Sequence, residues 1–264
     1  MSEVSFYKYQ GAGNDFIMID NRTLQLPRID TDRYRKWCDR KFGIGADGII
    51  FIQEADGYDF EMVYYNADGS EGSMCGNGGR CAVRFAHQLG IIEDKTRFLA
   101  VDGDHEASLL PQRWVSLGMN DVDEIKQADG GYFLNTGSPH HVAWVKDLKT
   151  YDVAAEGHKI RWQERYQPGG TNVNFVAVNA SAQLEVRTFE RGVEAETLAC
   201  GTGVTACALV WAHDYQKSGK QEINVQTLGG LLRVKFEAES GRFYNIFLEG
   251  PAEMVFKGQI VDNF

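Results

Sequence analysis

Residues 66–86 read Asn66-Ala-Asp-Gly-Ser-Glu-Gly-Ser-Met-Cys75-Gly-Asn-Gly-Gly-Arg-Cys81-Ala-Val-Arg-Phe-Ala86. A polar, glycine-rich loop here leads to Cys75 at the predicted start of a helix. The plan recurs at Glu190-Arg-Gly-Val-Glu-Ala-Glu-Thr-Leu-Ala-Cys200-Gly-Thr-Gly-Val-Thr-Ala-Cys207. A reaction that needs two facing thiols would require two such cysteines, each at a glycine-flanked helix N-terminus.

The segments before and after Cys75 alternate between predicted strands and helices. Phe16–Asp20 and Ile49–Ile52 are short apolar runs typical of buried strands. Thr31–Arg40 has a Thr or Asp cap and predicts a helix. Apolar side chains on one face are expected in the helix that follows Cys75.

The second half of the chain repeats this order. Gly169–Asn174 runs into the apolar Phe175–Val178, much as Gly11–Asp15 runs into Phe16–Ile19. The acidic segment Asn120–Gly131 is where we expect the chain to cross into a second domain. The repeat predicts an α/β (α+β) fold with two pseudo-symmetric domains, each a mixed sheet wrapped around a central helix.

Composition limits the function classes. The 264 residues include 37 acidic and 27 basic side chains, a formal charge of -10, which disfavours nucleic acid and anionic membrane surfaces as partners. The N-terminus lacks the features of a signal peptide, and no apolar run approaches the ~18 residues of a membrane span. We therefore expect a cytoplasmic protein that acts on a small molecule.

The five cysteines are an odd number in a chain of this kind, so free thiols are expected. Cys38, Cys81 and Cys207 suit a packing role. Zinc is disfavoured because the cysteine spacings lack C-x-x-C, and the glycine-rich segments match neither phosphate-binding fingerprint. No metal and no cofactor is predicted.

A thiol at a helix N-terminus meets the positive end of the helix dipole, which favours the thiolate. The neighbouring glycines allow backbone N–H groups to approach a carboxylate or an enolate-like oxygen. One such site would remove a proton from a carbon next to a carboxylate. Two facing sites would remove it from one face and supply another to the opposite face, which is racemisation or epimerisation without a cofactor.

At these residues the chain resembles the diaminopimelate epimerase family, cofactor-independent enzymes that interconvert LL- and meso-2,6-diaminopimelate on the way to lysine and peptidoglycan. The resemblance covers nearly the whole length. The matching motifs are, in order, Gly11-Ala-Gly-Asn14-Asp-Phe, Asn66-Ala-Asp-Gly-Ser, Met74-Cys75-Gly-Asn-Gly-Gly-Arg80-Cys, Gly137-Ser-Pro-His140, Asn172-Val-Asn-Phe175, Glu190-Arg191-Gly and Ala199-Cys200-Gly-Thr-Gly.

The resemblance implies barrel-like domains: residues 1–118, joined by a returning C-terminal strand 251–264, with Cys75, and residues 119–250 with Cys200. It also implies that these two cysteines are the thiolate and thiol of the catalytic pair. His140 and Glu190 resemble the pair that binds the substrate amino group and tunes the cysteine pKa values. The resemblance implies that the α-carboxylate of the substrate is bound by Gly76, Asn77, Gly201 and Thr202. It implies that the distal, non-reacting amino-acid end of the substrate is bound by Asn14, Asn66, Asn172 and Arg191.

Two positions depart from the family pattern. Ser138 stands where an Asn commonly reaches the distal carboxylate, so its hydrogen bond is expected to be shortened or replaced by water. Gly48 stands where some members have Gln, so a contact there would have to come from the backbone. Distal-end recognition is therefore where this chain is expected to differ most.

Alternative interpretations stay open at this point. Asn14, Asn66 and Asn172 are also typical of Asx-turns. His140 is compatible with a capped turn, and Arg191 with a surface ion pair. A proline or hydroxyproline racemase of the same fold is a rival, although a ring substrate has no second carboxylate for Arg191. A phenazine-biosynthesis-type isomerase lacks the cysteine pair, and a non-catalytic amino-acid-binding protein remains an option. The sequence also leaves open whether the protein is a monomer or a homodimer.

Overall fold

The computed structural model describes residues 2–179 and 183–262. The chain forms two compact units, Met1–Leu117 with Gly250–Phe264, and Gly118–Glu249. It passes between them just before the acidic segment in which the crossing was expected. Within the domains expected from the sequence, Met1, residues 180–182 and residues 263–264 lie outside the described part of the chain.

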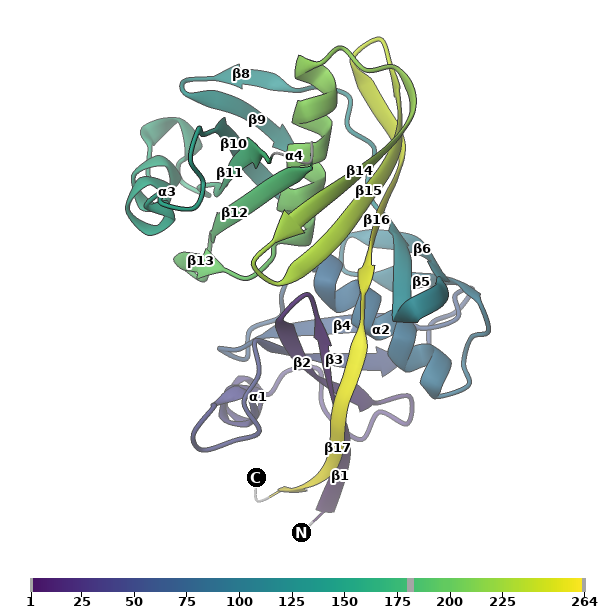
Figure 1. Cartoon of the computed structure of the whole chain (residues 1–264). Helices are drawn as coiled ribbons and strands as arrows, with labels where there is room; N and C mark the ends of the chain where they lie inside the picture. Colours follow the sequence, from purple (N-terminus) through teal and green to yellow (C-terminus); the bar gives the residue numbers. More distant parts are fainter. Residues whose placement is uncertain (1, 180–182, 263–264) are drawn as a thin grey trace. The chain divides into compact units, whose positions relative to one another are not determined.

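The elements of the first unit are β1 (Ser2–Gly11), β2 (Asn14–Asp20), α1 (Thr31–Cys38), β3 (Gly48–Gln53), β4 (Glu61–Asn66), α2 (Gly76–Gln88), β5 (Lys95–Ala100), β6 (Gly103–Leu109), the 3₁₀ turn η1 (Pro111–Arg113), β7 (Trp114–Gly118) and β17 (Glu253–Asp262). The last strand, β17, runs antiparallel to the first, β1, as the yellow and purple ribbons of Figure 1 show. The C-terminal segment thus completes the sheet that the N-terminus begins.

The elements of the second unit are β8 (Lys126–Ala128), β9 (Gly131–Asn135), β10 (Pro139–Trp144), α3 (Val153–Arg161), the 3₁₀ turn η2 (Glu164–Tyr166), β11 (Asn172–Val178), β12 (Leu184–Glu190), β13 (Ala195–Thr197), α4 (Gly201–Asp214), β14 (Gly219–Thr227), β15 (Gly230–Glu239) and β16 (Arg242–Pro251). Apart from β8, β13, β17 and the two 3₁₀ turns, this order matches that of the first unit.

Strand directions repeat as well. β2 and β3 are parallel, as are β10 and β11. β3 and β4 are antiparallel, as are β11 and β12. β4 pairs in parallel with β5, and β12 with β14. The predicted fold class, two similar domains with mixed sheets, is confirmed.

The strand β3 is covered on both faces, which explains its apolar sequence. In β3, every residue from Gly48 to Gln53 is buried, as expected for a strand packed on both faces. Ile49 and Phe51 contribute to the core cluster beneath α1. The side chain of Ile50 instead lies beside Gly78 in the first turn of α2. Alternate residues of one strand therefore contact different helices.

The helices α2 and α4 are the central elements of their units. α2 contacts β1, β2, β3, β4 and β6, and α4 contacts β9, β10, β11, β12, β14 and β15. Every residue from Gly201 to Val210 in α4 is buried, so the helix is apolar around its circumference rather than along one stripe. Burial on all sides holds each helix N-terminus in a defined position.

The structure corrects three details of the sequence analysis. The helix expected over Thr31–Arg40 ends at Cys38. The helix α3 was not anticipated, because its buried positions include Gly157 and Arg161 in place of an apolar stripe. Gly157 is required there, since a Cβ would lie 2.4 Å from Cβ of Phe189.

The third correction concerns the internal repeat. The turn that corresponds to Gly11–Asp15, between β1 and β2, is the one between β9 and β10, which contains Gly137. Gly169–Asn174 instead leads into β11, the counterpart of β3. The shared Gly and Asn composition of these turns misled the comparison, whereas strand order identifies the counterparts.

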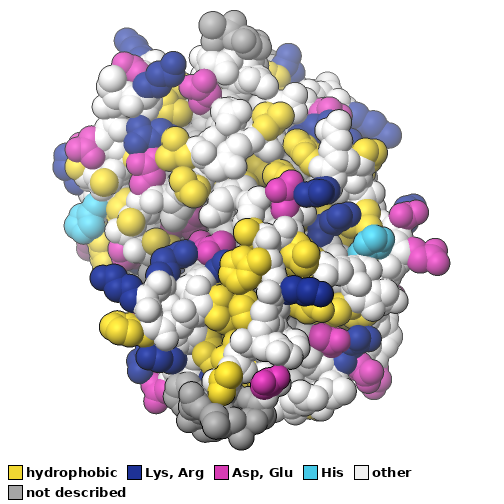
Figure 2. Space-filling view, turned by 60° about the horizontal axis from the view of Figure 1, so that its bottom comes forward, with side chains coloured by type: hydrophobic (Ala, Val, Ile, Leu, Met, Phe, Trp, Pro, Cys, Tyr) yellow, Lys and Arg dark blue, Asp and Glu magenta, His cyan; other side chains and the backbone are white. Residues whose placement is uncertain are grey.

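Charged side chains of both signs are interspersed on the molecular face drawn in Figure 2, in dark blue and magenta. The excess of acidic residues therefore forms no single block on that face. Within residues 2–179 and 183–262, no helix is long and apolar enough to cross a membrane.

Candidate active site

Cys75 is the N-cap residue of α2. Its sulfur accepts a hydrogen bond from the backbone N–H of Gly78 at 3.5 Å, which satisfies one donor of the first helical turn. The same sulfur lies 3.6 Å from Oδ1 of Asn14, to which its S–H donates. Cys75 is only partly buried, so a reagent or substrate can approach it.

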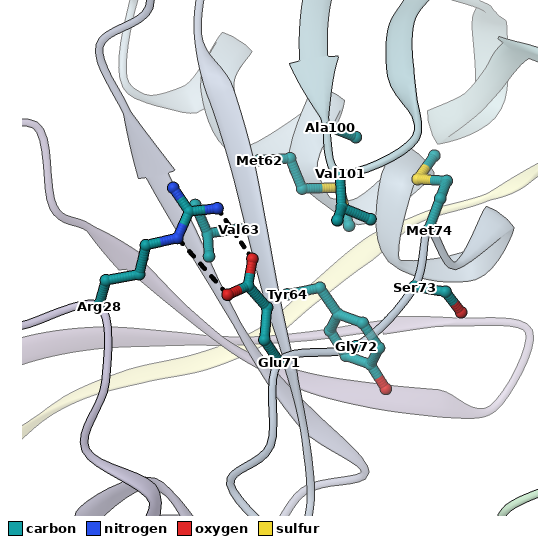
Figure 3. A pocket seen from close by; sticks show the side chains of 10 residues that line it. All are labelled: Arg28, Met62, Val63, Tyr64, Glu71, Gly72, Ser73, Met74, Ala100 and Val101. Atoms are coloured by element: carbon teal, nitrogen blue, oxygen red, sulfur yellow. Dashed lines mark hydrogen bonds and ion pairs between the residues drawn. The ribbon is translucent and has the colours of Figure 1, made fainter.

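The loop before Cys75 is tied to the sheet of its own unit. Figure 3 shows the guanidinium of Arg28 facing the carboxylate of Glu71, with the shorter contact at 2.8 Å. One residue later, the N–H of Gly72 donates to the carbonyl of Tyr64 at 2.8 Å. A Cβ on Gly72 would lie 2.5 Å from the Tyr64 ring, so the close approach requires glycine. These contacts place the loop that carries Cys75.

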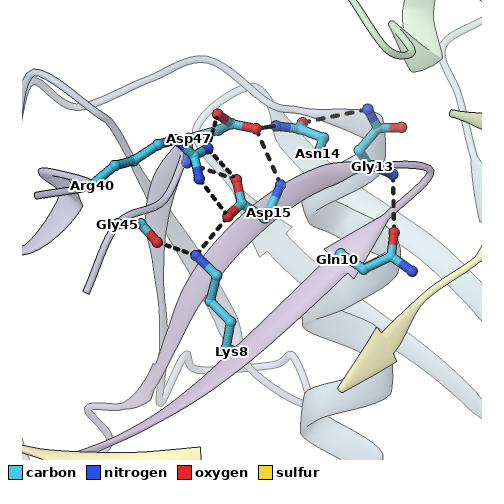
Figure 4. A network of polar contacts seen from close by, with 9 residues as sticks. Lys8, Gln10, Gly13, Asn14, Asp15, Arg40, Gly45 and Asp47 are labelled. Atoms are coloured by element: carbon cyan, nitrogen blue, oxygen red, sulfur yellow. Dashed lines mark hydrogen bonds and ion pairs between the residues drawn. The ribbon is translucent and has the colours of Figure 1, made fainter. Parts of the chain in front are cut away.

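Asn14 is held by a network of charged groups (Figure 4). Its Nδ2 donates to Oδ2 of Asp47 at 2.7 Å. Arg40 pairs with Asp15 at 2.6 Å and with Asp47 at 2.7 Å, and the buried Lys8 pairs with Asp15 at 2.7 Å. Burial raises the pKa of Asp15, but hydrogen bonds from Arg40 and Lys8 outweigh it and hold the pKa at about 2. The Asp15 carboxylate is therefore ionised at neutral pH.

Arg80 supports the same helix entrance from inside. It is fully buried, and its guanidinium donates to the carbonyl of Gly76 at 3.1 Å and to Oδ1 of Asn77 at 3.0 Å. Burial lowers the pKa of Arg80 to about 10, and Coulomb interactions with Cys81 and Cys75 oppose this shift. Since a guanidinium only donates, Asn77 must direct its amide NH₂ the other way, to Asn14 Oδ1 at 3.4 Å.

Cys200 is the N-cap residue of α4 and is 8% exposed. Its sulfur lies 3.4 Å from the hydroxyl of Thr202. The hydroxyl of Thr205 donates to the carbonyl of Gly201 at 3.1 Å, the same carbonyl position that Arg80 holds in α2. The two cysteines thus occupy equivalent positions in the two units.

His140 lies in β10 and is fully buried. Its Nε2 is 2.8 Å from the Thr202 hydroxyl and its Nδ1 is 3.0 Å from Nδ2 of Asn174. Burial lowers the pKa of His140 to about 3, and the positive charge of Arg191 adds to this effect. The imidazole is therefore neutral at physiological pH, with both ring nitrogens hydrogen-bonded.

Asn172 and Arg191 lie together at adjoining strand ends. Oδ1 of Asn172 accepts from the backbone N–H of Arg191 at 2.9 Å, and its Nδ2 donates to the carbonyl of Pro139 at 3.2 Å. The Arg191 side chain donates to the carbonyl of Gly169 at 3.3 Å. Glu190 accepts from the hydroxyl of Thr197.

The other predicted positions are also located. Asn66 ends β4, and its side chain donates to the Ser70 hydroxyl at 3.2 Å, forming part of the loop that leads to Cys75. Ser138 lies in the turn before β10. The structure thus brings Cys75, Asn14 and Asn77 together in one unit, and Cys200, Thr202 and His140 together in the other.

The remaining cysteines are buried and all five are free. Burial raises the pKa of Cys38 to about 12 and raises those of Cys81 and Cys207 further. Their thiols are therefore protonated at neutral pH. Among the described residues, no group of three or more His, Cys, Asp or Glu is arranged to hold a metal ion.

Sequence reasoning missed three residues that support these sites, namely Asp47, Arg80 and Asn174. For Asn174 there was a signal, since it is a polar residue between apolar neighbours in a strand, Val173 and Phe175. Buried polar groups need hydrogen-bond partners, so such a residue points to a neighbour with a matching donor or acceptor. Asp47 stands in a Gly-Ala-Asp-Gly turn and gave no comparable signal.

Comparison with known proteins identifies the family of the chain. The family model described as "Diaminopimelate epimerase" matches residues 6–121 and 132–255, one stretch in each half of the chain. A curated relative from Flavobacterium psychrophilum, named diaminopimelate epimerase, is 50% identical over 257 residues, which cover 97% of this chain and 100% of the relative.

Two solved structures share the fold at low sequence identity. A phenazine biosynthesis protein of the PhzF family from Bacillus anthracis has a TM-score of 0.80 at 13% identity, covering 99% of this chain and 100% of that one. A probable proline racemase from Agrobacterium radiobacter K84 has a TM-score of 0.74 at 14% identity, covering 99% and 94%. At these identities the likeness concerns the fold alone. The family match and the full-length relative are decisive, and the chain belongs to the diaminopimelate epimerase family, a family of isomerases.

Proposed function

We propose that this protein interconverts LL-2,6-diaminopimelate and meso-diaminopimelate without a cofactor, as a cytoplasmic step in the synthesis of lysine and of peptidoglycan precursors. The family membership and the name of the Flavobacterium psychrophilum relative support the substrate. The observation that carries the chemistry is the equivalence of Cys75 and Cys200, each the N-cap of the central helix of its unit. A duplicated fold that keeps a thiol at both helix entrances suits a reaction with two proton-transfer groups.

In the proposed reaction, one cysteine is a thiolate and the other a thiol. The thiolate takes the α-proton, which breaks a C–H bond, forms an S–H bond and leaves the electron pair delocalised into the α-carboxylate. The thiol then gives its proton to the opposite face of the same carbon. The products are the inverted α-carbon and the second cysteine as thiolate, so atoms and charge balance. The roles exchange for the reverse direction.

Binding of the α-carboxylate is assigned to the first turns of α2 and α4, at Gly76 and Asn77 and at Gly201 and Thr202. The backbone N–H groups of a first helical turn and the helix dipole favour a negative charge there. These groups also stabilise the additional charge that develops as the proton leaves. The same N–H donors therefore bind the substrate carboxylate and accelerate the proton transfer.

The distal, non-reacting end is assigned to Asn14, Asn66, Asn172 and Arg191, with Ser138 beside them. Arg191 supports this role because its backbone is fixed by Asn172 and its guanidinium has further N–H donors beyond the one used on Gly169. An arginine presents these donors in a fork that matches a carboxylate. A substrate with a second amino-acid end satisfies this group, and proline does not.

The test is incubation of the purified protein with LL-diaminopimelate in deuterated water, with L-proline and L-hydroxyproline in parallel. We expect deuterium at one α-carbon of diaminopimelate together with formation of the meso isomer, and no exchange with either ring amino acid. Exchange with proline alone would favour the racemase interpretation. Binding of diaminopimelate without exchange would favour a non-catalytic binding protein.

A further inference from the structure

Asn174 has no role in the proposed proton transfer, yet it is a fully buried polar residue within β11. Its amide lies between the side chains of His140 and Thr188 and also contacts the backbone of His141. The first turn of α4 lies against it, since a Cβ on Gly203 would be 2.2 Å from Asn174 Oδ1. The site therefore depends on an asparagine from β11 and a glycine from α4.

The orientation of this amide follows from one backbone group. The atom 3.1 Å from the carbonyl oxygen of His141 must be the NH₂ nitrogen, because a carbonyl only accepts. The amide oxygen then faces the hydroxyl of Thr188 at 3.0 Å and accepts its proton. The second N–H of the amide points to Nδ1 of His140 at 3.0 Å.

This donation determines the tautomer of His140. A nitrogen that accepts a hydrogen bond carries no proton, so the proton of the neutral ring is on Nε2. Nε2–H donates to the Thr202 oxygen at 2.8 Å. Because a lone pair of the Thr202 oxygen accepts this hydrogen bond, the Thr202 hydroxyl proton points elsewhere, to the sulfur of Cys200 at 3.4 Å.

We propose that Asn174 is a positioning residue of the active site: it holds His140 as the Nε2–H tautomer and thereby directs the Thr202 hydroxyl as a donor to Cys200. This inference rests on the proposed function for its significance, since a donated hydrogen bond stabilises the thiolate that removes the α-proton. The opposite tautomer would draw the Thr202 proton to the imidazole and leave an oxygen lone pair facing the sulfur.

The charged groups near this chain of hydrogen bonds do not oppose it. Arg191 acts on His140 electrostatically and favours its neutral form. Glu190, the last residue of β12, accepts from the hydroxyl of Thr197. Neutral His140 is thus maintained over the pH range in which a cysteine titrates.

The direct test uses the unmodified protein. Two-dimensional ¹⁵N–¹H NMR of histidine-labelled protein at pH 8 separates Nε2–H from Nδ1–H rings, and the His140→Gln variant assigns the signal among the six histidines. We expect the Nε2–H pattern for His140. An Nδ1–H pattern for His140 would overturn the proposal.

Variants then test the link to the sulfur in a Cys75→Ser background, where alkylation at neutral pH reports on Cys200. Asn174→Asp provides an acceptor for Nδ1–H and is expected to invert the tautomer. Thr202→Val removes the hydroxyl but keeps the shape of the side chain. Each is expected to slow alkylation at pH 7 about tenfold, the size of one hydrogen bond to a charged acceptor.

The double variant Asn174→Asp/Thr202→Val is expected to be no slower than Thr202→Val alone, because both changes act through one hydroxyl. The matched control is Thr188→Val, which removes the partner of Oδ1 but leaves the contacts of Nδ2, and it is expected to keep both tautomer and alkylation rate. Additive effects, or an unchanged rate in Thr202→Val, would overturn the link. None of these measurements uses substrate, so absence of epimerase activity would contradict the proposed function alone.

Discussion

The entrance of α2 and the entrance of α4 use the same backbone arrangement with different polar partners. In both, a cysteine caps a buried helix and glycines occupy the first turn. The sulfur of Cys75 faces an acceptor, Oδ1 of Asn14, whereas that of Cys200 lies beside a hydroxyl, that of Thr202. An acceptor favours the thiol and a donor favours the thiolate. In the proposed reaction, one type of helix cap would therefore serve opposite protonation states because its polar neighbour differs.

The side chain that holds the first carbonyl of the helix also differs between α2 and α4. Arg80 holds the carbonyl of Gly76, and the equivalent Thr205 holds that of Gly201. Arg80 brings a buried positive charge to the acceptor-facing thiol, while Thr205 is neutral. In the proposed reaction, this charge would stabilise a thiolate at Cys75 when the direction reverses.

The largest expected effect comes from removing either thiol. In Cys75→Ser and in Cys200→Ser, epimerisation should fall about a thousandfold or more, because a hydroxyl is a far poorer base. Elimination of halide from a 3-halo analogue needs proton removal from one face only, so each variant should retain it with one stereoisomer. The measurement is halide release from both isomers. If one variant lost elimination with both isomers while the other still epimerised, a one-base mechanism would replace this interpretation.

Acid should destabilise the unit that carries Cys200 before the other. Burial lowers the pKa of His140 and of His141 to about 3 and about 4. Between pH 6.5 and about 4 the unfolded chain therefore binds more protons, and the free energy of unfolding falls as pH falls. The loss is about 2 kcal/mol for each histidine between pH 7 and pH 5.

Hydrogen exchange read separately for the two units, and corrected for its intrinsic pH dependence, measures this difference. In the first unit, the pKa of Asp15 is lowered to about 2. Its contribution to the free energy of unfolding is therefore lost only below about pH 4, outside the range from pH 7 to pH 5. Equal loss of protection in both units between pH 7 and pH 5 would contradict the prediction.

The third residue after each cysteine is a glycine, Gly78 in α2 and Gly203 in α4. We expect Gly203→Ala to lower the free energy of unfolding by about 2 kcal/mol more than Gly78→Ala does. At Gly203 the new Cβ would lie 2.2 Å from Oδ1 of Asn174, which is held by hydrogen bonds. At Gly78, the matched control, it would lie 2.9 Å from the end of the Ile50 side chain, which can move. Urea unfolding of Gly203→Ala and Gly78→Ala measures the difference, and comparable stabilities would show that Asn174 is not rigidly held.

The smallest effect concerns the orientation of Asn14. Asp47→Ala removes the acceptor that holds Nδ2 of Asn14 away from Cys75, so the amide can turn and donate to the sulfur. In a Cys200→Ser background, we expect the midpoint of the alkylation pH profile of Cys75 to fall by about half a unit, less than one full hydrogen bond. Arg40→Gln, which keeps the Asp47–Asn14 contact, is the control. An unchanged midpoint in Asp47→Ala would mean that Asp47 does not orient Asn14.

Much of the architecture could be predicted from local sequence. Cysteine before glycines and an apolar run marks the start of a buried helix, and both such helices begin where expected. The apolar strand β3 could also be predicted from the sequence, because burial on both faces leaves little room for polar residues. The helix α3 escaped notice because packing against Phe189 requires a glycine where an apolar residue would have signalled the helix.

The sequence by itself determined that two thiols cap two buried helices, because capping is a matter of adjacent residues. Which polar group faces each thiol was decided by tertiary structure. Asn14 is 61 positions from Cys75, and His140 is 62 positions from Thr202. Such partners are chosen by strand order and register, and the direction of each hydrogen bond is set by a further group, Asp47 in one unit and the carbonyl of His141 in the other. A hydrogen bond depends on distances of a few ångströms between residues far apart in the chain, and these distances exist only after folding.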